Sequence, residues 1–331
     1  MTVSMPEALV DQAELATSKA RLLRHSWPSY LLSSMLAGAF VGVAVLLMVM
    51  VSAAWIVSKG PVARLVEGSV FGVALALVVF AGAELWTGNA MTMVHGLMKR
   101  TASFGDTVAV LVGSIVGNLV GSIGFAVLVN ASGVLHTGAA KGKPAVFVTA
   151  VAALVKSKAA LTGGQLFFRS ILCNMLVCLA LWMAARTKSD AAKLIVLSWG
   201  LLAFVASGFE HSVANMTLFS LGALAHVGTW SELSRNLLWT IPGNLVGGGL
   251  IVGFSYGWLG RPVPAPAVAG APTLTVDLGE PAPAAALVAA APVATAPVGT
   301  ASAPAAAAPA ALVRRRRPKA AGAEAALGTS G

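Results

Sequence analysis

The sequence predicts an all-helical integral membrane protein with six transmembrane helices, arranged as an inverted repeat of three plus three. Three observations support this fold class. The 331 residues are 57% hydrophobic and 10% charged, with a mean hydropathy of +0.83, and a soluble core cannot bury that much apolar surface. Apolar stretches long enough to cross a membrane recur along the chain. Two groups of residues return at one constant offset.

The apolar stretches define a membrane domain. Each has about 20 residues or more, the length that crosses roughly 30 Å of hydrocarbon in a helix. They occupy residues 27–57, 70–98, 108–134, 165–185, 192–226 and 237–259. We therefore expect a cytoplasmic N-terminal segment over 1–26, a six-span domain over 27–260, and a tail over 261–331.

The segments outside the spans differ in composition. Residues 1–26 are charged and lack the short apolar core and cleavage site of a signal peptide, so we expect none to be removed. From 261 to 331, Ala and Pro dominate without periodicity, which predicts a disordered cytoplasmic tail. Its basic residues bind anionic membrane lipid, or the tail is a linker with no specific role. They are Arg314, Arg315, Arg316, Arg317 and Lys319.

The charged residues and cysteines exclude other classes. Most Lys and Arg lie in both termini and in the loops after the second and fourth spans, so the positive-inside rule places both termini in the cytoplasm, with the chain in the inner (plasma) membrane. No aromatic-interleaved basic stripe indicates nucleic acid as a partner. Cys173 and Cys178 lie on different faces of one helix, and no histidines are spaced as metal ligands. We expect no disulfide, metal or cofactor.

One offset relates the two halves of the membrane domain. The motif Gly-Asn-Leu-Val-Gly at 117–121, in the third span, returns at 243–247 in the sixth. The same offset relates three pairs of identical residues in the second and fifth spans: Gly82 and Gly208, Glu84 and Glu210, and Asn89 and Asn215. Each half then holds three spans, and because three is odd, the second half inserts upside down.

An inverted repeat places the substrate path near the midplane, beside helices that are broken there. The candidates are 82–91 and 207–216, where glycine and polar side chains interrupt the apolar pattern. Irregular backbone at membrane depth persists only when it is buried in protein or lines a cavity. We therefore expect helices two and five to be broken. The glycines of the repeated motif are expected to let spans three and six approach their neighbours closely.

Two polar side chains at the midplane are candidates for contact with a substrate. His211 is ionisable at membrane depth, where burial is costly, and its charge changes near neutral pH, so it can offer a charge or a proton to an anion. The alternative is a neutral histidine hydrogen-bonded in a packed core. Thr87 can donate a hydroxyl hydrogen bond opposite His211, or it bonds only to the backbone.

The paired acids and nearby apolar residues allow two interpretations each. Glu84 and Glu210 hold the broken segments by hydrogen bonds, or they relay protons; the first is favoured because acids in an anion path repel the substrate. Four apolar side chains form collars around His211, or simply pack: Leu75, Leu85, Trp86 and Phe204.

Three motifs in order resemble the signatures of the formate/nitrite transporter family. They are Gly-Ala-Glu-Leu-Trp-Thr-Gly at 82–88, Cys-Asn-Met-Leu-Val-Cys-Leu-Ala at 173–180 and Gly-Phe-Glu-His-Ser at 208–212. The resemblance covers roughly residues 20 to 260. The runs at 214–219 and 236–239 are more similar to the nitrite-channel branch than to the formate branch.

The resemblance implies an aquaporin-like fold and a homopentamer with one pore per protomer, in which a central histidine lies between apolar constrictions. It matches Thr87 and His211 to the two broken helices and Leu75 and Phe204 to the constrictions. Lys158 matches the lysine of the family's vestibule, and Asn174 matches a characteristic position on span four. Trp86 departs from the family, which usually has phenylalanine there. The Ala/Pro tail has no counterpart in the family core.

These inferences predict a transporter and not an enzyme. We expect small monovalent anions, first of all nitrite, to collect near Lys158 and to share a proton with His211, which reduces the charge that must pass the apolar collar. Formate or hydrosulfide through the same pore is an alternative. A neutral-solute facilitator is another, although the paired Asn-Pro-Ala loops of aquaporins are absent. An enzyme would require Ser207 or Ser212 to act with His211.

Overall fold

The computed structural model describes residues 2–261, and every regular element among them is a helix. Several helices begin at serine or threonine caps that their sequence supplies, including the Ser103–Asp106 and Thr162–Gln165 capping boxes. The helices are α1 Met5–His25, α2 Trp27–Val57, α3 Ala63–Phe71, α4 Val73–Ala81, α5 Trp86–Met98, α6 Phe104–Ser132, η1 Val134–His136, α7 Val146–Ala159, α8 Gly163–Ala185, α9 Asp190–Ala206, α10 Ser212–Leu224, α11 Trp230–Leu245, η2 Val246–Phe254 and α12 Ser255–Leu259.

Five helical stretches in the described residues are long and apolar enough to cross a membrane. They are α2, α3 with α4, α6, α8, and the continuous run α11–η2–α12. The run predicted over 192–226 divides into α9 and the shorter apolar α10. Gly208 and polar neighbours interrupt it. The expected breaks at 82–91 and 207–216 are confirmed, because α4 ends at Ala81 and α9 at Ala206.

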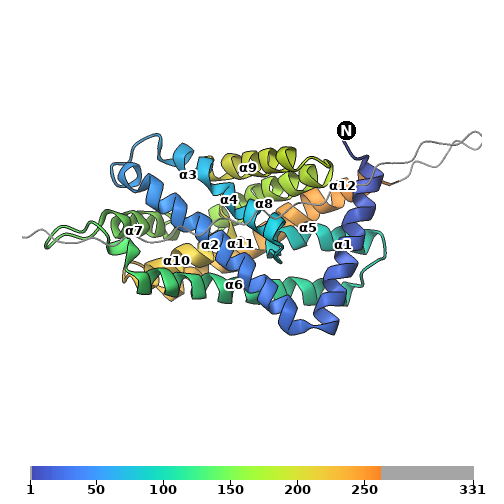
Figure 1. The fold of residues 1–331 in the computed structure, drawn as a ribbon, viewed down its shortest axis with the longest axis horizontal. Coiled ribbons are helices and arrows are strands. Elements are labelled where there is room, and N and C mark those ends of the chain that lie inside the picture. The colour runs from blue at the N-terminus through green and yellow to red at the C-terminus, as the bar shows by residue number, and fades with distance from the viewer. Residues whose placement is uncertain (1, 262–331) are drawn as a thin grey trace, which may run out of the picture. The chain divides into compact units, whose positions relative to one another are not determined.

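Two helix pairs form the frame of the molecule. α2 packs along α6, and α8 packs along α11 and η2 (Figure 1). At Gly121 a side chain would meet the carbonyl group of Met35 in α2, and at Gly247 it would meet that of Ile171 in α8. The expectation that the glycines of the repeated motif allow close approach is therefore confirmed.

α1 and α7 lie at opposite ends of the described part of the chain (Figure 1). α1 crosses the direction of the long helices and packs on α5, where the Thr92 hydroxyl donates to Gln12 Oε1 at 3.0 Å. α7 packs on α2 and α10. We call these the α1 end and the α7 end.

The tail predicted over 261–331, with its lipid-binding basic cluster, lies almost entirely outside the described residues. Only Arg261, whose guanidinium carbon lies 4.2 Å from the Trp258 ring centroid, is described. The predicted boundary near residue 260 stays a prediction, as does the division at residues 26 and 27.

Gly121→Ala is expected to lower the free energy of unfolding by about 1–3 kcal/mol, because the added methyl overlaps the Met35 carbonyl group. Gly124→Ala is the matched control on the same helix, since a side chain there meets nothing within 4 Å. Thermal unfolding in detergent compares the two variants. Equal midpoints for both would contradict the close approach of α2 and α6.

Candidate functional site

Two interrupted helices place their restarting ends inside the protein. The backbone leaves α4 at Gly82 with φ 78° and leaves α9 at Gly208 with φ 70°, a left-handed conformation that glycine adopts without steric cost. Helix resumes at Trp86 in α5 and at Ser212 in α10. A helix N-terminus carries a partial positive charge, so both restarting ends favour an anion.

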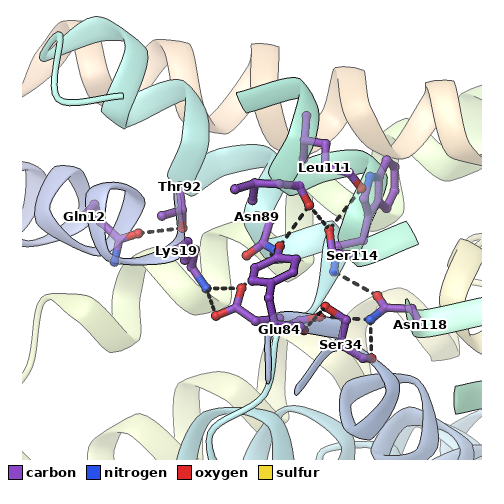
Figure 2. Close-up of polar contacts among 12 residues, drawn as sticks. Gln12, Lys19, Ser34, Glu84, Asn89, Thr92, Leu111, Ser114 and Asn118 are labelled. Atoms are coloured by element: carbon purple, nitrogen blue, oxygen red, sulfur yellow. Dashed lines mark hydrogen bonds and ion pairs between the residues drawn. The ribbon is translucent and has the colours of Figure 1, made fainter. Parts of the chain in front are cut away.

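Asn118 bonds the first break to the frame. Its Nδ2 donates to the carbonyls of Ser34 at 2.8 Å and Glu84 at 2.9 Å, and its Oδ1 accepts from the Trp86 N–H at 2.9 Å. Figure 2 shows Asn118 beside Ser34 and Glu84. The side chain therefore replaces hydrogen bonds that a continuous helix would have made.

Asn244 bonds the second break in the same pattern. Its Nδ2 donates to the carbonyls of Ser170 at 2.7 Å and Glu210 at 3.1 Å, and its Oδ1 accepts from the Ser212 N–H at 2.9 Å. Each asparagine is the second residue of the repeated Gly-Asn-Leu-Val-Gly motif. The sequence repeat is thus also a repeat of contacts.

The paired acids each bind a lysine and an asparagine. Glu84 accepts from Lys19 Nζ at 2.7 and 2.8 Å and from Asn89 Nδ2 at 3.1 Å, as Figure 2 shows. Glu210 accepts from Lys158 Nζ at 2.8 Å and from Asn215 Nδ2 at 2.7 Å. These contacts agree with the favoured interpretation that the acids hold the broken segments. They also compensate carboxylates that are only 13% and 2% exposed.

His211 and Thr87 meet between the two breaks. Thr87 Oγ1 lies 3.2 Å from His211 Nε2, and both residues are buried. His211 Nδ1 accepts from the Ala214 N–H at 3.1 Å, so Nδ1 carries no proton and the neutral ring has its hydrogen on Nε2. Phe204 stacks on the imidazole with ring centroids 5.7 Å apart. The histidine therefore presents an N–H toward Thr87.

Three cavities share lining residues near this contact, and His211 lines two of them. The α7-end cavity, of about 300 Å³, is lined by Lys158, Glu210, Phe204 and His211 among others. The α1-end cavity, of about 540 Å³, is lined by Lys19, Glu84 and Leu85 among others. Between them is a central cavity of about 10 Å³, whose lining includes Leu75, Leu85, Phe204 and His211. About one water molecule fits such a volume, so apolar side chains separate the two larger cavities.

The structure brings most of the predicted residues together, but in different roles. Leu75, Leu85, Phe204 and His211 line the central cavity, and Lys158 lines the α7-end cavity. Trp86 lines none of these three cavities; its side chain is 1% exposed and packed. A place for it in the collar stays a prediction.

Asn174 acts on the site through the backbone. Its Nδ2 donates to the carbonyls of Thr87 at 3.1 Å and Asn244 at 2.7 Å, and Gly248 leaves the room that this amide occupies. Both cysteines are buried and free, and Cys178 Sγ contacts the Thr87 carbonyl at 3.3 Å. Within residues 2–261, no group of three His, Cys, Asp or Glu side chains could hold a metal, and neither Ser207 nor Ser212 hydrogen-bonds His211 through its hydroxyl.

Sequence reasoning missed several residues at the site. The signal for Asn118 and Asn244 was present, because a buried amide recurs in two otherwise apolar spans, but only the glycines of that motif were interpreted. Lys19 gave no such signal: it pairs with Glu84 as Lys158 pairs with Glu210, yet the two lysines are not related by the repeat offset. Arg64, Glu67 and Arg169 also line the α7-end cavity.

Asn244→Leu is expected to destabilise the fold by about 2 kcal/mol or more, because the Ser212 N–H and the Glu210 carbonyl lose a buried partner. The fraction of monodisperse protein left after heating in detergent measures the loss. Asn130→Leu is the control, since the Asn130 side chain makes no hydrogen bond within residues 2–261. Similar survival of both variants would show that Asn244 does not support the break.

Comparison with known proteins identifies relatives. The family model described as "Formate/nitrite transporter" matches residues 6–258. The nitrite transporter NirC of Salmonella typhimurium is 42% identical over 254 residues, covering 75% of this chain and 90% of that protein. A solved FNT family ion channel matches with a TM-score of 0.70 and 38% identity, covering 77% of this chain and 99% of that one. A pentameric formate channel with formate bound matches with a TM-score of 0.59 and 27% identity, covering 70% and 96%.

Proposed function

Because the chain belongs to the formate/nitrite transporter family, we propose that it moves small monovalent anions across a membrane, with nitrite as the first substrate. The observation that carries the proposal is the His211–Thr87 contact, which lies at two helix N-termini between the two larger cavities. The identity to a nitrite transporter over 254 residues supports nitrite.

The proposal includes six crossings in an inverted three-plus-three arrangement. α9 and α10 together make the fifth crossing, as α3, α4 and α5 make the second. The matching contacts of Asn118 and Asn244 support this symmetry. The distribution of Lys and Arg supports cytoplasmic termini and a place in the inner membrane. The matched pentameric formate channel supports assembly as a homopentamer.

Passage begins in the cavities at the two ends. Each holds a lysine beside a half-buried or buried carboxylate and narrows toward apolar side chains. An anion that leaves such a cavity loses water and gains no ionic partner in the collar, which is the costly step. The 10 Å³ central cavity does not hold nitrite, so Phe204, Leu75 or Leu85 turns aside during passage.

His211 reduces that cost by sharing its Nε2 proton. In the structure this N–H faces Thr87 Oγ1, and an anion entering the contact replaces the hydroxyl as acceptor. Thr87 then turns its own O–H to the anion. The hydrogen bond that Nδ1 accepts from Ala214 keeps the ring oriented. Two donors and two helix N-termini thus face the anion where water is excluded.

Formate is the second candidate, because one of the matched solved structures is a channel with formate bound. Hydrosulfide fits the same chemistry as a small monovalent anion. A path that moves either one in place of nitrite would leave the roles of His211 and Thr87 unchanged.

His211→Phe is expected to lower nitrite uptake into proteoliposomes, because the anion loses the Nε2–H donor at the apolar collar. Phenylalanine keeps the stacking on Phe204 but offers no proton. His136→Phe is the matched control, because His136 is exposed at the α7 end. Undiminished uptake by His211→Phe would refute the role of the histidine.

A further inference from the structure

The α7-end cavity contains two arginines that the proposed path does not use. Arg64 comes from α3 and Arg169 from α8, and both guanidinium groups reach Gly208 at the second helix break. Arg169 Nη1 donates to the Gly208 carbonyl at 3.4 Å. The Arg64 guanidinium occupies the space that a side chain at Gly208 would need: a Cβ added to this glycine would lie 2.8 Å from Arg64 Nη1.

The two arginines differ from Lys158, the lysine in the same cavity, in their ion pairing. Lys158 is neutralised by Glu210, with 2.8 Å between Nζ and Oε1. Within residues 2–261, neither Arg64 nor Arg169 has a carboxylate oxygen within 4.0 Å. Within the described lining of this cavity, the cationic groups without a carboxylate partner are therefore the two guanidinium groups.

We propose that Arg64 and Arg169 form a receiving site for one planar, monovalent oxyanion at the mouth of the α7-end cavity. A guanidinium fork matches two oxygens on one atom, as in nitrite or a carboxylate, whereas an ammonium acts as a point charge. Gly208 supports the site because its missing side chain lets Arg64 lie close to the backbone. Gly208, which both arginines contact, is two residues before Glu210 and three before His211. An anion bound by the arginines is therefore next to the narrow part of the path. This inference rests on the proposed function and deepens it.

The charge of the cavity selects the valence of the anion. Three cationic side chains line it, and two carboxylates oppose them, so with both acids ionised and His211 neutral the lining carries one net positive charge. The titratable lining residues are Arg64, Glu67, Lys158, Arg169, Glu210 and His211. One monovalent anion neutralises the site, whereas sulfate or hydrogen phosphate leaves an excess negative charge in a partly enclosed space.

The test measures nitrite uptake into proteoliposomes as a function of nitrite concentration. Arg64→Gln is expected to raise the half-saturating concentration roughly three- to tenfold with little change in the maximal rate, because a receiving site acts before the narrow step. Glu67→Gln is expected to lower the half-saturating concentration, because the net positive charge of the cavity lining rises. Lys156→Gln is the matched control: it removes a positive charge from the last turn of α7, where Lys156 is exposed and lines none of the three cavities.

An equal rise of the half-saturating nitrite concentration in Arg64→Gln and Lys156→Gln would overturn the receiving site, because it would indicate only a diffuse positive potential. A second readout separates this failure from failure of the proposed function. Broadening of the ¹³C-formate NMR signal by detergent-solubilised protein reports binding without transport. The site predicts broadening by the wild type and Lys156→Gln, less by Arg64→Gln, and no reversal by equimolar sulfate. Binding of this kind without nitrite uptake would overturn the transport proposal alone; equal broadening by all variants would overturn the receiving site.

Discussion

Two breaks in membrane-embedded helices impose the constraint on which the structure depends: the backbone groups they free must find partners away from water. Asn118 and Asn244 supply those partners, each joining the two sides of one break and a neighbouring helix with three hydrogen bonds. The glycines beside them bring α2 against α6 and α8 against α11 and η2, which puts each amide within reach. The two anchored breaks hold Glu84 and Glu210 and bring Thr87 of α5 to His211.

The anchored breaks organise charge along the path. Glu84 and Glu210 lie in the two breaks, and each pairs with a lysine that lines one of the two larger cavities. Among the described residues that line the central cavity, His211 is the only polar one, and its Nε2 lies 3.2 Å from Thr87 Oγ1. An anion is therefore attracted at either end and meets hydrogen-bond donors where its desolvation is most costly. In the proposed function, the apolar collar and the Nε2–H of His211 favour small monovalent anions over larger or doubly charged ones.

Much of this arrangement is visible in the sequence. Hydropathy locates the spans, and one offset locates both breaks, because duplicated segments keep the residues that interrupt helices. The meeting of Thr87 and His211 was predicted from their places beside the two different breaks and from the resemblance to the family. Lys19 and the Arg64–Arg169 pair were not predicted, because α1, α3 and α8 reach the site from separate parts of the chain and no periodicity records which of their side chains converge. Hydropathy alone does not register the five-residue break between α9 and α10; the repeat offset and the polar residues at 207–216 predicted it.

The most direct test of the account is the permeability of liposomes that contain the wild-type protein, measured for nitrite and for glycerol in the same preparation. The account predicts saturable nitrite uptake above that of empty liposomes and no glycerol-driven swelling, because charge-selective cavities and a dry collar favour a small anion that shares a proton. Swelling in glycerol without nitrite uptake would contradict it and would indicate a path for neutral solutes.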